Sequence, residues 1–176
     1  MKLVRRQFLA AAAVVTLACG AGTAFAKATV IKVALWDKGA MTMNMLGKAQ
    51  PMGMAMEMDP KMPPAEHKMG MGPMGIKVSA ATVPSGDVTF NVTNTSKQMM
   101  HEMVISPVAD PKKPLPYNKA ENKVDEDAAG HLGEVADLEA GKKGSITITM
   151  KPGTYLLYCN IPGHYVLGMW TLLTVK

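Results

Sequence analysis

Hydrophobic and polar residues alternate along several short stretches of this chain. The sequence DVTFNVTN places Val88, Phe90 and Val92 on one face with polar residues between them, which is the period of a half-buried strand. Other stretches of similar length are rich in β-branched and apolar residues: 29–35, 75–83, 101–108, 145–150, 154–160 and 169–175. Only residues 121–129 leave room for a helix, of one or two turns. The pattern predicts about seven or eight strands.

Turn-forming residues separate these stretches. They contain glycine, proline or both, and they lie at residues 84–86, 141–144, 151–153 and 161–163. Many short strands separated by turns predict an all-β protein, built as an antiparallel β-sandwich. The sequence is 48% hydrophobic but only 5% aromatic, so we expect a core made mainly of Val, Ile, Leu and Met.

Two longer stretches do not follow the strand pattern. Residues 107–130 contain several prolines and an acidic run at 125–127, which predicts an exposed crossover connection. Residues 38–75 hold 11 of the 17 methionines, together with several glycines and prolines. We interpret this Met-rich segment, residues 38–75, as an insertion that forms no packed element.

The N-terminus resembles an export signal. An arginine pair at residues 5–6 precedes a short apolar run and a small-x-small cleavage motif at residues 24–26. Such an arginine pair occurs in twin-arginine leaders and in the basic start of general secretory leaders, and Cys19 leaves lipidation as an alternative. We therefore expect a signal peptide over residues 1–26, a mature domain over residues 27–176, and export to the bacterial periplasm.

The charge of the chain argues against some classes of partner. The formal net charge is +5, but the expected leader carries three of the 19 basic residues, so the mature chain keeps 16 basic and 14 acidic residues. No basic cluster interleaves with aromatic residues, so we expect no nucleic acid partner. No apolar run reaches the length of about 18 residues that spans a bilayer, so we expect no transmembrane segment.

The cysteine content indicates a protected thiol. With Cys19 in the leader, Cys159 is the only cysteine of the mature chain, so it has no intramolecular disulfide partner in an oxidising compartment. Such a thiol is buried, paired between chains, or bound to a ligand. A metal protects it best, because coordination holds it as a bound thiolate.

A loop near the C-terminus combines three candidate metal ligands. In the sequence YCNIPGHYVLGM, Cys159, His164 and Met169 recur at intervals of five residues around a Pro-Gly turn. Thiolate, imidazole and thioether form a soft ligand set that favours copper, and electron-transfer copper sites use a second histidine. The other histidines of the chain are His67, His101 and His131.

Among these histidines, His101 is the best placed, because it begins a predicted strand and a loop-to-strand junction can fix an imidazole. His131 follows Gly130 in the acidic connection, where we expect an exposed side chain, and His67 lies in the Met-rich segment. Zinc is an alternative metal, since Cys and His also bind it. The alternative without metal is a buried thiol beside ordinary core methionine.

Two longer stretches around these candidate ligands resemble a known protein family. The stretches VTNTSKQMMHEMVI and KPGTYLLYCNIPGHYVLGMW resemble the cupredoxins, the plastocyanin- and azurin-like blue type 1 copper proteins. The resemblance covers residues 29–176 once the Met-rich segment is set aside. It implies a Greek-key β-sandwich with one type 1 copper ion. By the same resemblance the metal ligands are His101, Cys159, His164 and Met169.

Glu102 departs from the family pattern. Several cupredoxins have Asn or Ser after the first ligand histidine, and its hydrogen bonds steady the cysteine loop. The residue at this position is a glutamate here, and an ionised carboxylate cannot donate a hydrogen bond.

The resemblance implies a carrier of single electrons between Cu(I) and Cu(II), which transforms no substrate and so is not an enzyme. We expect a monomer whose partner is a redox protein. His164 should lie at the surface end of the loop, in an apolar patch that docks this partner, with capping of the core as the alternative role for these side chains. The patch consists of Ile161, Pro162, Val166 and Leu167.

The Met-rich segment supports an alternative function in copper homeostasis. Clustered thioethers suit Cu(I), so this segment would bind additional Cu(I) weakly and the partner would be a copper-handling protein. A linker in which methionine is merely tolerated is the plainer interpretation. A third hypothesis, an extracellular adhesion module, rests on the fold class alone.

Overall fold

The computed structural model describes residues 28–39, 73–111, 113 and 115–176. These residues form eleven strands and no helix, which confirms the all-β prediction. The strands are β1 (Thr29–Asp37), β2 (Met74–Val78), β3 (Thr82–Val83), β4 (Gly86–Asn94), β5 (His101–Pro107), β6 (Tyr117–Asn118), β7 (Lys123–Val124), β8 (Gly133–Leu138), β9 (Lys143–Met150), β10 (Gly153–Tyr158) and β11 (Trp170–Val175).

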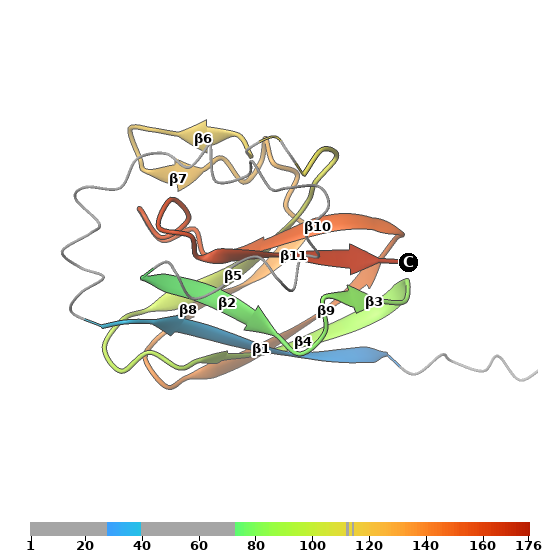
Figure 1. The fold of residues 1–176 in the computed structure, drawn as a ribbon, viewed down its shortest axis with the longest axis horizontal. Coiled ribbons are helices and arrows are strands. Elements are labelled where there is room, and N and C mark those ends of the chain that lie inside the picture. Colours follow the sequence, from blue (N-terminus) through green and yellow to red (C-terminus); the bar gives the residue numbers. More distant parts are fainter. Residues whose placement is uncertain (1–27, 40–72, 112, 114) are drawn as a thin grey trace, which may run out of the picture.

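Two sheets pack face to face as a β-sandwich (Figure 1). One sheet has the strand order β2-β1-β4-β9, and the other has the order β3-β11-β10-β5-β8. Most neighbouring strands are antiparallel, as expected, but β1 runs parallel to β4 and β3 runs parallel to β11. The hairpin of β6 and β7 lies outside the two sheets, at the top of Figure 1.

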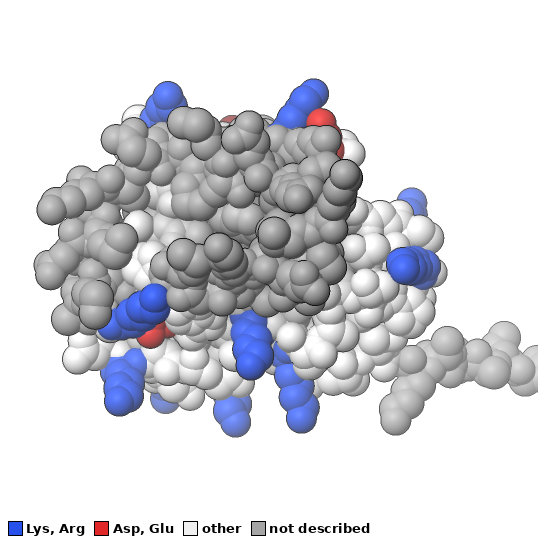
Figure 2. All heavy atoms as spheres, viewed as in Figure 1, with Lys and Arg blue, Asp and Glu red and all other residues white. Residues whose placement is uncertain are grey.

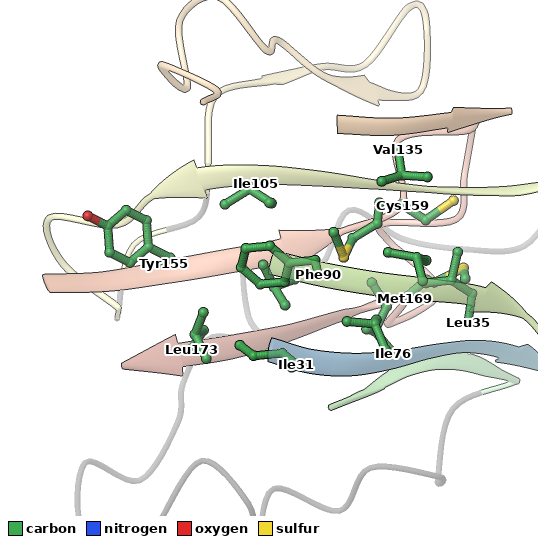
Figure 3. Close-up of a cluster of buried hydrophobic side chains, with 14 of the residues drawn as sticks. Ile31, Leu35, Ile76, Phe90, Ile105, Val135, Tyr155, Cys159, Met169 and Leu173 are labelled. Atoms are coloured by element: carbon green, nitrogen blue, oxygen red, sulfur yellow. The ribbon is translucent and has the colours of Figure 1, made fainter. Parts of the chain in front are cut away.

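The main core lies between the two sheets. In β4, Val88, Phe90 and Val92 are almost completely buried, while the residues between them are not, because successive side chains of a strand point to opposite faces. Figure 3 shows Cys159 and Met169 at one end of this core cluster. The loop with the predicted ligands therefore closes one end of the sandwich.

The structure corrects two predictions about single elements and adds one strand that was not predicted. Residues 75–83 form two strands instead of one, because β2 pairs with β1 while β3 pairs with β11 of the other sheet. The added strand is β8, whose sequence shows no clear alternation of apolar and polar residues. Its backbone is also irregular, because Asp137 has a φ of 46° and the pairing with β5 shifts in register. Residues 121–129 form no helix, because Lys123 and Val124 pair with β6 and turns follow them.

The connection over residues 107–130 is largely exposed, as its composition predicts, but four of its apolar residues are buried. It packs on the outer face of the five-stranded sheet and forms a second, smaller core there. This core contains Val108, Leu115, Val124 and Ala129 of the connection, and Val104, Leu156, Tyr158, Tyr165, Val166 and Leu172 of the sheet and the ligand loop. The connection therefore adds a layer beside the ligand loop.

The predictions for the signal peptide and for most of the Met-rich segment fall on residues 1–27 and 40–72, outside the described residues. Within the described part of the chain, no helix is long and apolar enough to cross a membrane. Figure 2 shows the described basic side chains spread over several parts of this face.

Candidate metal centre

His101 is the first residue of β5, and Asn94 fixes the loop that leads to it. The Nδ2 of Asn94 donates to the carbonyls of Met99 (2.8 Å) and Leu138 (2.7 Å). The Oδ1 of Asn94 accepts from the Ser96 N–H (2.9 Å), a local bond that short polar side chains favour in turns. Both Asn94 and His101 are completely buried, so the loop delivers the imidazole into the interior.

Backbone hydrogen bonds hold the three candidate ligands of the C-terminal loop. The Cys159 N–H donates to the Met169 carbonyl (3.0 Å), and the Met169 N–H donates to the His164 carbonyl (3.1 Å). Gly163 has a φ of 83°, in the left-handed region that favours glycine. Cys159 and Met169 are thus joined at the base of the loop, and neither has exposed surface.

Three candidate donor atoms converge at this buried end of the sandwich. His101 Nδ1 lies 3.2 Å from His164 Nδ1, and His164 Nδ1 lies 3.3 Å from Cys159 Sγ. The ligand atoms of these three residues all lie within 4.8 Å of one another. Among the described residues, no other group of three His, Cys, Asp or Glu side chains has such a spacing.

The electrostatics of this cluster favour a bound cation. Burial raises the pKa of Cys159 to about 12, although the backbone N–H groups of Glu102 and Ile161 lower it. Burial, together with the nearby His101, lowers the pKa of His164 to about 4. Two Nδ1 lone pairs at this distance repel each other unless a proton or a metal lies between them. Two imidazole nitrogens and a thiolate sulfur, shielded from water, fit copper.

Asp37 contacts the cluster, although the sequence analysis did not identify it. Its Oδ2 lies 2.9 Å from His101 Nε2, and its side chain is 2% exposed. The sequence did contain a signal. The inward-facing row of β1 continues from Val33 and Leu35 to Asp37, so a carboxylate occupies a position where the pattern predicts an apolar residue.

Glu102 contacts Cys159 through its backbone. The Glu102 N–H donates to Cys159 Sγ (3.5 Å). Its carboxyl group is buried, and its Oε1 has no hydrogen-bond partner in the described part of the chain. Burial, together with the charge of Glu134, raises the pKa of Glu102 to about 7. A second missed residue, Asn160, ties the ligand loop to β7 through its buried side chain.

The predicted apolar docking patch around His164 is wrong. His164 is only 3% exposed, and Val166 and Leu167 are buried as well. Pro162 is exposed and Ile161 is partly buried. These side chains therefore mainly cap the core, which was the alternative interpretation of the loop.

The remaining histidines do not join the cluster in the described structure. His131 is exposed, as expected from its place in the acidic connection, and it is not among the three clustered residues. His67 lies outside the described residues. Of the two described candidates for the second histidine, His101 and His131, His101 is the one that folding brings to the loop.

Comparison with known proteins gives consistent matches. The family model of copper-binding proteins of the plastocyanin/azurin family matches residues 65–176. Auracyanin-B of Chloroflexus aurantiacus is 32% identical over 103 residues, which make up 58% of this chain and 37% of that protein. The chain thus spans little more than a third of this relative. Rusticyanin from Thiobacillus ferrooxidans is 19% identical, with a TM-score of 0.51 over 86% of this chain and 79% of that one, and so shares the fold.

Proposed function

Because this chain belongs to the plastocyanin/azurin family of copper-binding proteins, we propose that it holds one type 1 copper ion and exchanges single electrons with a redox partner protein. The observation that carries this proposal is the convergence of His101 Nδ1, His164 Nδ1 and Cys159 Sγ at a buried end of the sandwich. We assign these three residues as ligands, and Met169 as a fourth and weaker ligand.

The residues of the chain keep this donor set in place. When bound, copper supplies a one-electron couple between Cu(I) and Cu(II). The hydrogen bonds of Cys159 with Met169 and Glu102 fix the thiolate and give it a donor, and such contacts tune a metal site. The burial of all four assigned ligands excludes water from the donor atoms. No step transforms a substrate, so the proposed function is not enzymatic.

The test of this function is optical. Copper-loaded wild-type protein should show an intense visible thiolate-to-Cu(II) absorption band, and the Cys159→Ser variant should lack it. His131→Ala is the matched control, because this histidine is exposed and outside the cluster, and it should keep the band unchanged. A colourless copper-loaded wild type contradicts the proposal.

The proposal extends to the organisation of the chain. Residues 1–26 form a signal peptide, and residues 27–176 form one monomeric domain. Its Met-rich insertion begins at residue 38 and ends earlier than residue 75, because β2 already begins at Met74. The basic and apolar pattern of the N-terminus supports export to the periplasm. Mass spectrometry of the protein purified from a periplasmic fraction tests this. A mature chain that begins at Lys27 supports the assignment, whereas a retained residue 1 contradicts it.

The ends of the Met-rich segment favour a second function, copper homeostasis. The segment leaves the sheet directly after Asp37, whose side chain contacts His101. It returns at Pro73, whose carbonyl accepts from the Lys38 N–H (2.8 Å). Methionines bound to Cu(I) along the segment would therefore be tethered at both ends beside the copper ligand His101. We propose that they capture Cu(I) weakly for transfer to this site or to a copper-handling partner.

A matched pair of proteins tests the second function. In one, a short Gly-Ser turn replaces residues 41–71, which keeps the Lys38 to Pro73 hydrogen bond and all the assigned ligands. We expect the full-length protein to bind more Cu(I) equivalents than this variant, while both keep one Cu(II) with the same visible band. Equal Cu(I) stoichiometries contradict the capture function and leave the electron-transfer proposal intact.

A further inference from the structure

The side chain of Asp37 joins the first strand of the protein to the copper site. Its Oδ2 lies 2.9 Å from His101 Nε2, and the exposed fractions of the His101 and Asp37 side chains are 0% and 2%. Its other oxygen, Oδ1, accepts from the Gly39 N–H (2.6 Å). The carboxylate is therefore held from two sides while it contacts the imidazole.

A carboxylate at this position is costly for the fold. Burying an ionised group costs free energy unless hydrogen bonds compensate for it, and an apolar residue would continue the row of Val33 and Leu35. Two contacts compensate for the burial here: Oδ1 of Asp37 accepts from the Gly39 N–H, and Oδ2 lies within hydrogen-bond distance of His101 Nε2. The fold thus places a carboxyl oxygen, a hydrogen-bond acceptor, beside His101 Nε2.

This acceptor decides which nitrogen of His101 carries the proton. An ionised carboxylate only accepts hydrogen bonds, so Nε2 of the neutral imidazole must be the donor. The proton is then on Nε2, and Nδ1 keeps its lone pair. Nδ1 is the atom that lies 3.2 Å from His164 Nδ1. In the other tautomer a proton would point into the cluster and would have to leave before a metal could bind.

We propose that Asp37 is a positioning residue of the copper site, which fixes the ring and the tautomer of His101 so that Nδ1 is ready to bind the metal. This inference rests on the proposed function, in which His101 is a copper ligand. A carboxylate that accepts a hydrogen bond from the nitrogen of a ligand histidine that does not bind the metal makes that histidine a more basic ligand. Its negative charge also stabilises the positive charge of the metal. Asp37 thereby favours Cu(II) over Cu(I).

Two substitutions separate the hydrogen bond from the charge. Asp37→Asn keeps an oxygen that can accept from Nε2 but removes the charge, whereas Asp37→Ala removes both. The control is Asp87→Asn on β4, which removes a carboxylate of the same sheet that accepts a hydrogen bond from Thr149 Oγ1 (2.6 Å). Asp87 pairs with Thr149 near the start of β4, and Asp37 is the last residue of β1. Because β1 and β4 are parallel, the two carboxylates lie at opposite ends of the sheet.

The expected results follow from these roles. Asp37→Ala should bind Cu(II) about 10- to 100-fold more weakly than wild type and should shift the thiolate-to-Cu(II) band. Asp37→Asn should bind Cu(II) more nearly like wild type but with a higher reduction potential, because the negative charge is gone. Asp87→Asn should match wild type in all three measurements.

A third variant separates this inference from the proposed function. If His101→Ala keeps wild-type copper affinity and absorption, His101 is not a ligand and the proposed function fails together with the inference. If His101→Ala loses the site while both Asp37 variants match Asp87→Asn, only the positioning role is overturned.

A measurement on the metal-free wild-type protein is independent of how the variants fold. Nitrogen-15 NMR of the His101 ring should show the proton on Nε2. A proton on Nδ1 in the folded metal-free protein overturns the proposal.

Discussion

The side chain of Asn160 is bonded to both polar groups of the Val124 backbone. The Val124 N–H donates to Asn160 Oδ1 (2.6 Å), and Asn160 Nδ2 donates to the Val124 carbonyl (2.9 Å). Nδ2 also donates to Glu126 Oε1 (2.7 Å). Because Asn160 directly follows Cys159, these bonds attach the cysteine end of the ligand loop to the connection that packs beside it.

This attachment predicts a loss of stability in Asn160→Ala. The change leaves the buried N–H and C=O of Val124 without the partner that they have here, so we expect the free energy of unfolding to fall by about 2–4 kcal/mol. Denaturant unfolding of the metal-free protein measures this. Ser145→Ala, which removes an exposed side-chain bond to Asn91, should cost less than about 1 kcal/mol. Equal losses in the two variants contradict the role of Asn160.

The sequence predicted the candidate ligands, but it did not predict the polar residues that support them. The candidate ligands were predicted from their residue types and their spacing, and both can be read from the sequence. The supports come from residues that end inward-facing rows of strands: Asp37 follows Leu35 on β1, and Asn94 follows Val92 on β4. Their partners are 64 and 44 residues away, and the strand period carries no information about such distant contacts.

The connection over residues 107–130 shows a similar limit for the fold. Its prolines and acidic residues predicted exposure, and several of its residues are exposed. Its four buried apolar residues are scattered among them without a period, so they gave no strand or helix signal. They become buried by packing against Leu156, Tyr158 and Leu172 on the outer face of the five-stranded sheet. These three residues are distant in the sequence.

Removal of the metal should leave a thiol that reacts poorly. Cys159 is completely buried, and burial raises its pKa to about 12, so the reactive thiolate is scarce at neutral pH. We expect a thiol-labelling reagent to modify the folded metal-free protein far more slowly than the same protein in denaturant. Labelling of the folded protein at the unfolded rate would show that Cys159 is not enclosed as described.

The proposed role of Met169 predicts a change in potential without a loss of fold. Met169→Leu conserves volume in the core, so it should cost less than about 1.5 kcal/mol of stability, but it removes the thioether. We expect the variant to keep copper and the thiolate band while its reduction potential rises, because weak axial donation favours Cu(II). Met150→Leu, which changes another buried methionine, controls for packing and should leave the potential unchanged. A potential that is the same in all three proteins contradicts the assignment of Met169 as a ligand.

Gly163 allows a last prediction, which separates the shape of the ligand loop from general strain. Gly163 and Gly141 have similar φ values of 83° and 77°, so alanine at either position should cost about 1–2 kcal/mol of backbone strain. The Gly163 N–H donates to the Asn122 carbonyl (2.9 Å), and His164 follows it directly, whereas Gly141 lies in the turn before β9. We therefore expect Gly163→Ala to lose copper to a chelator faster than wild type, because relief of the strain shifts His164. Gly141→Ala should lose similar stability but release copper at the wild-type rate. If both variants release copper equally fast, the loop conformation at Gly163 has no particular role in holding the metal.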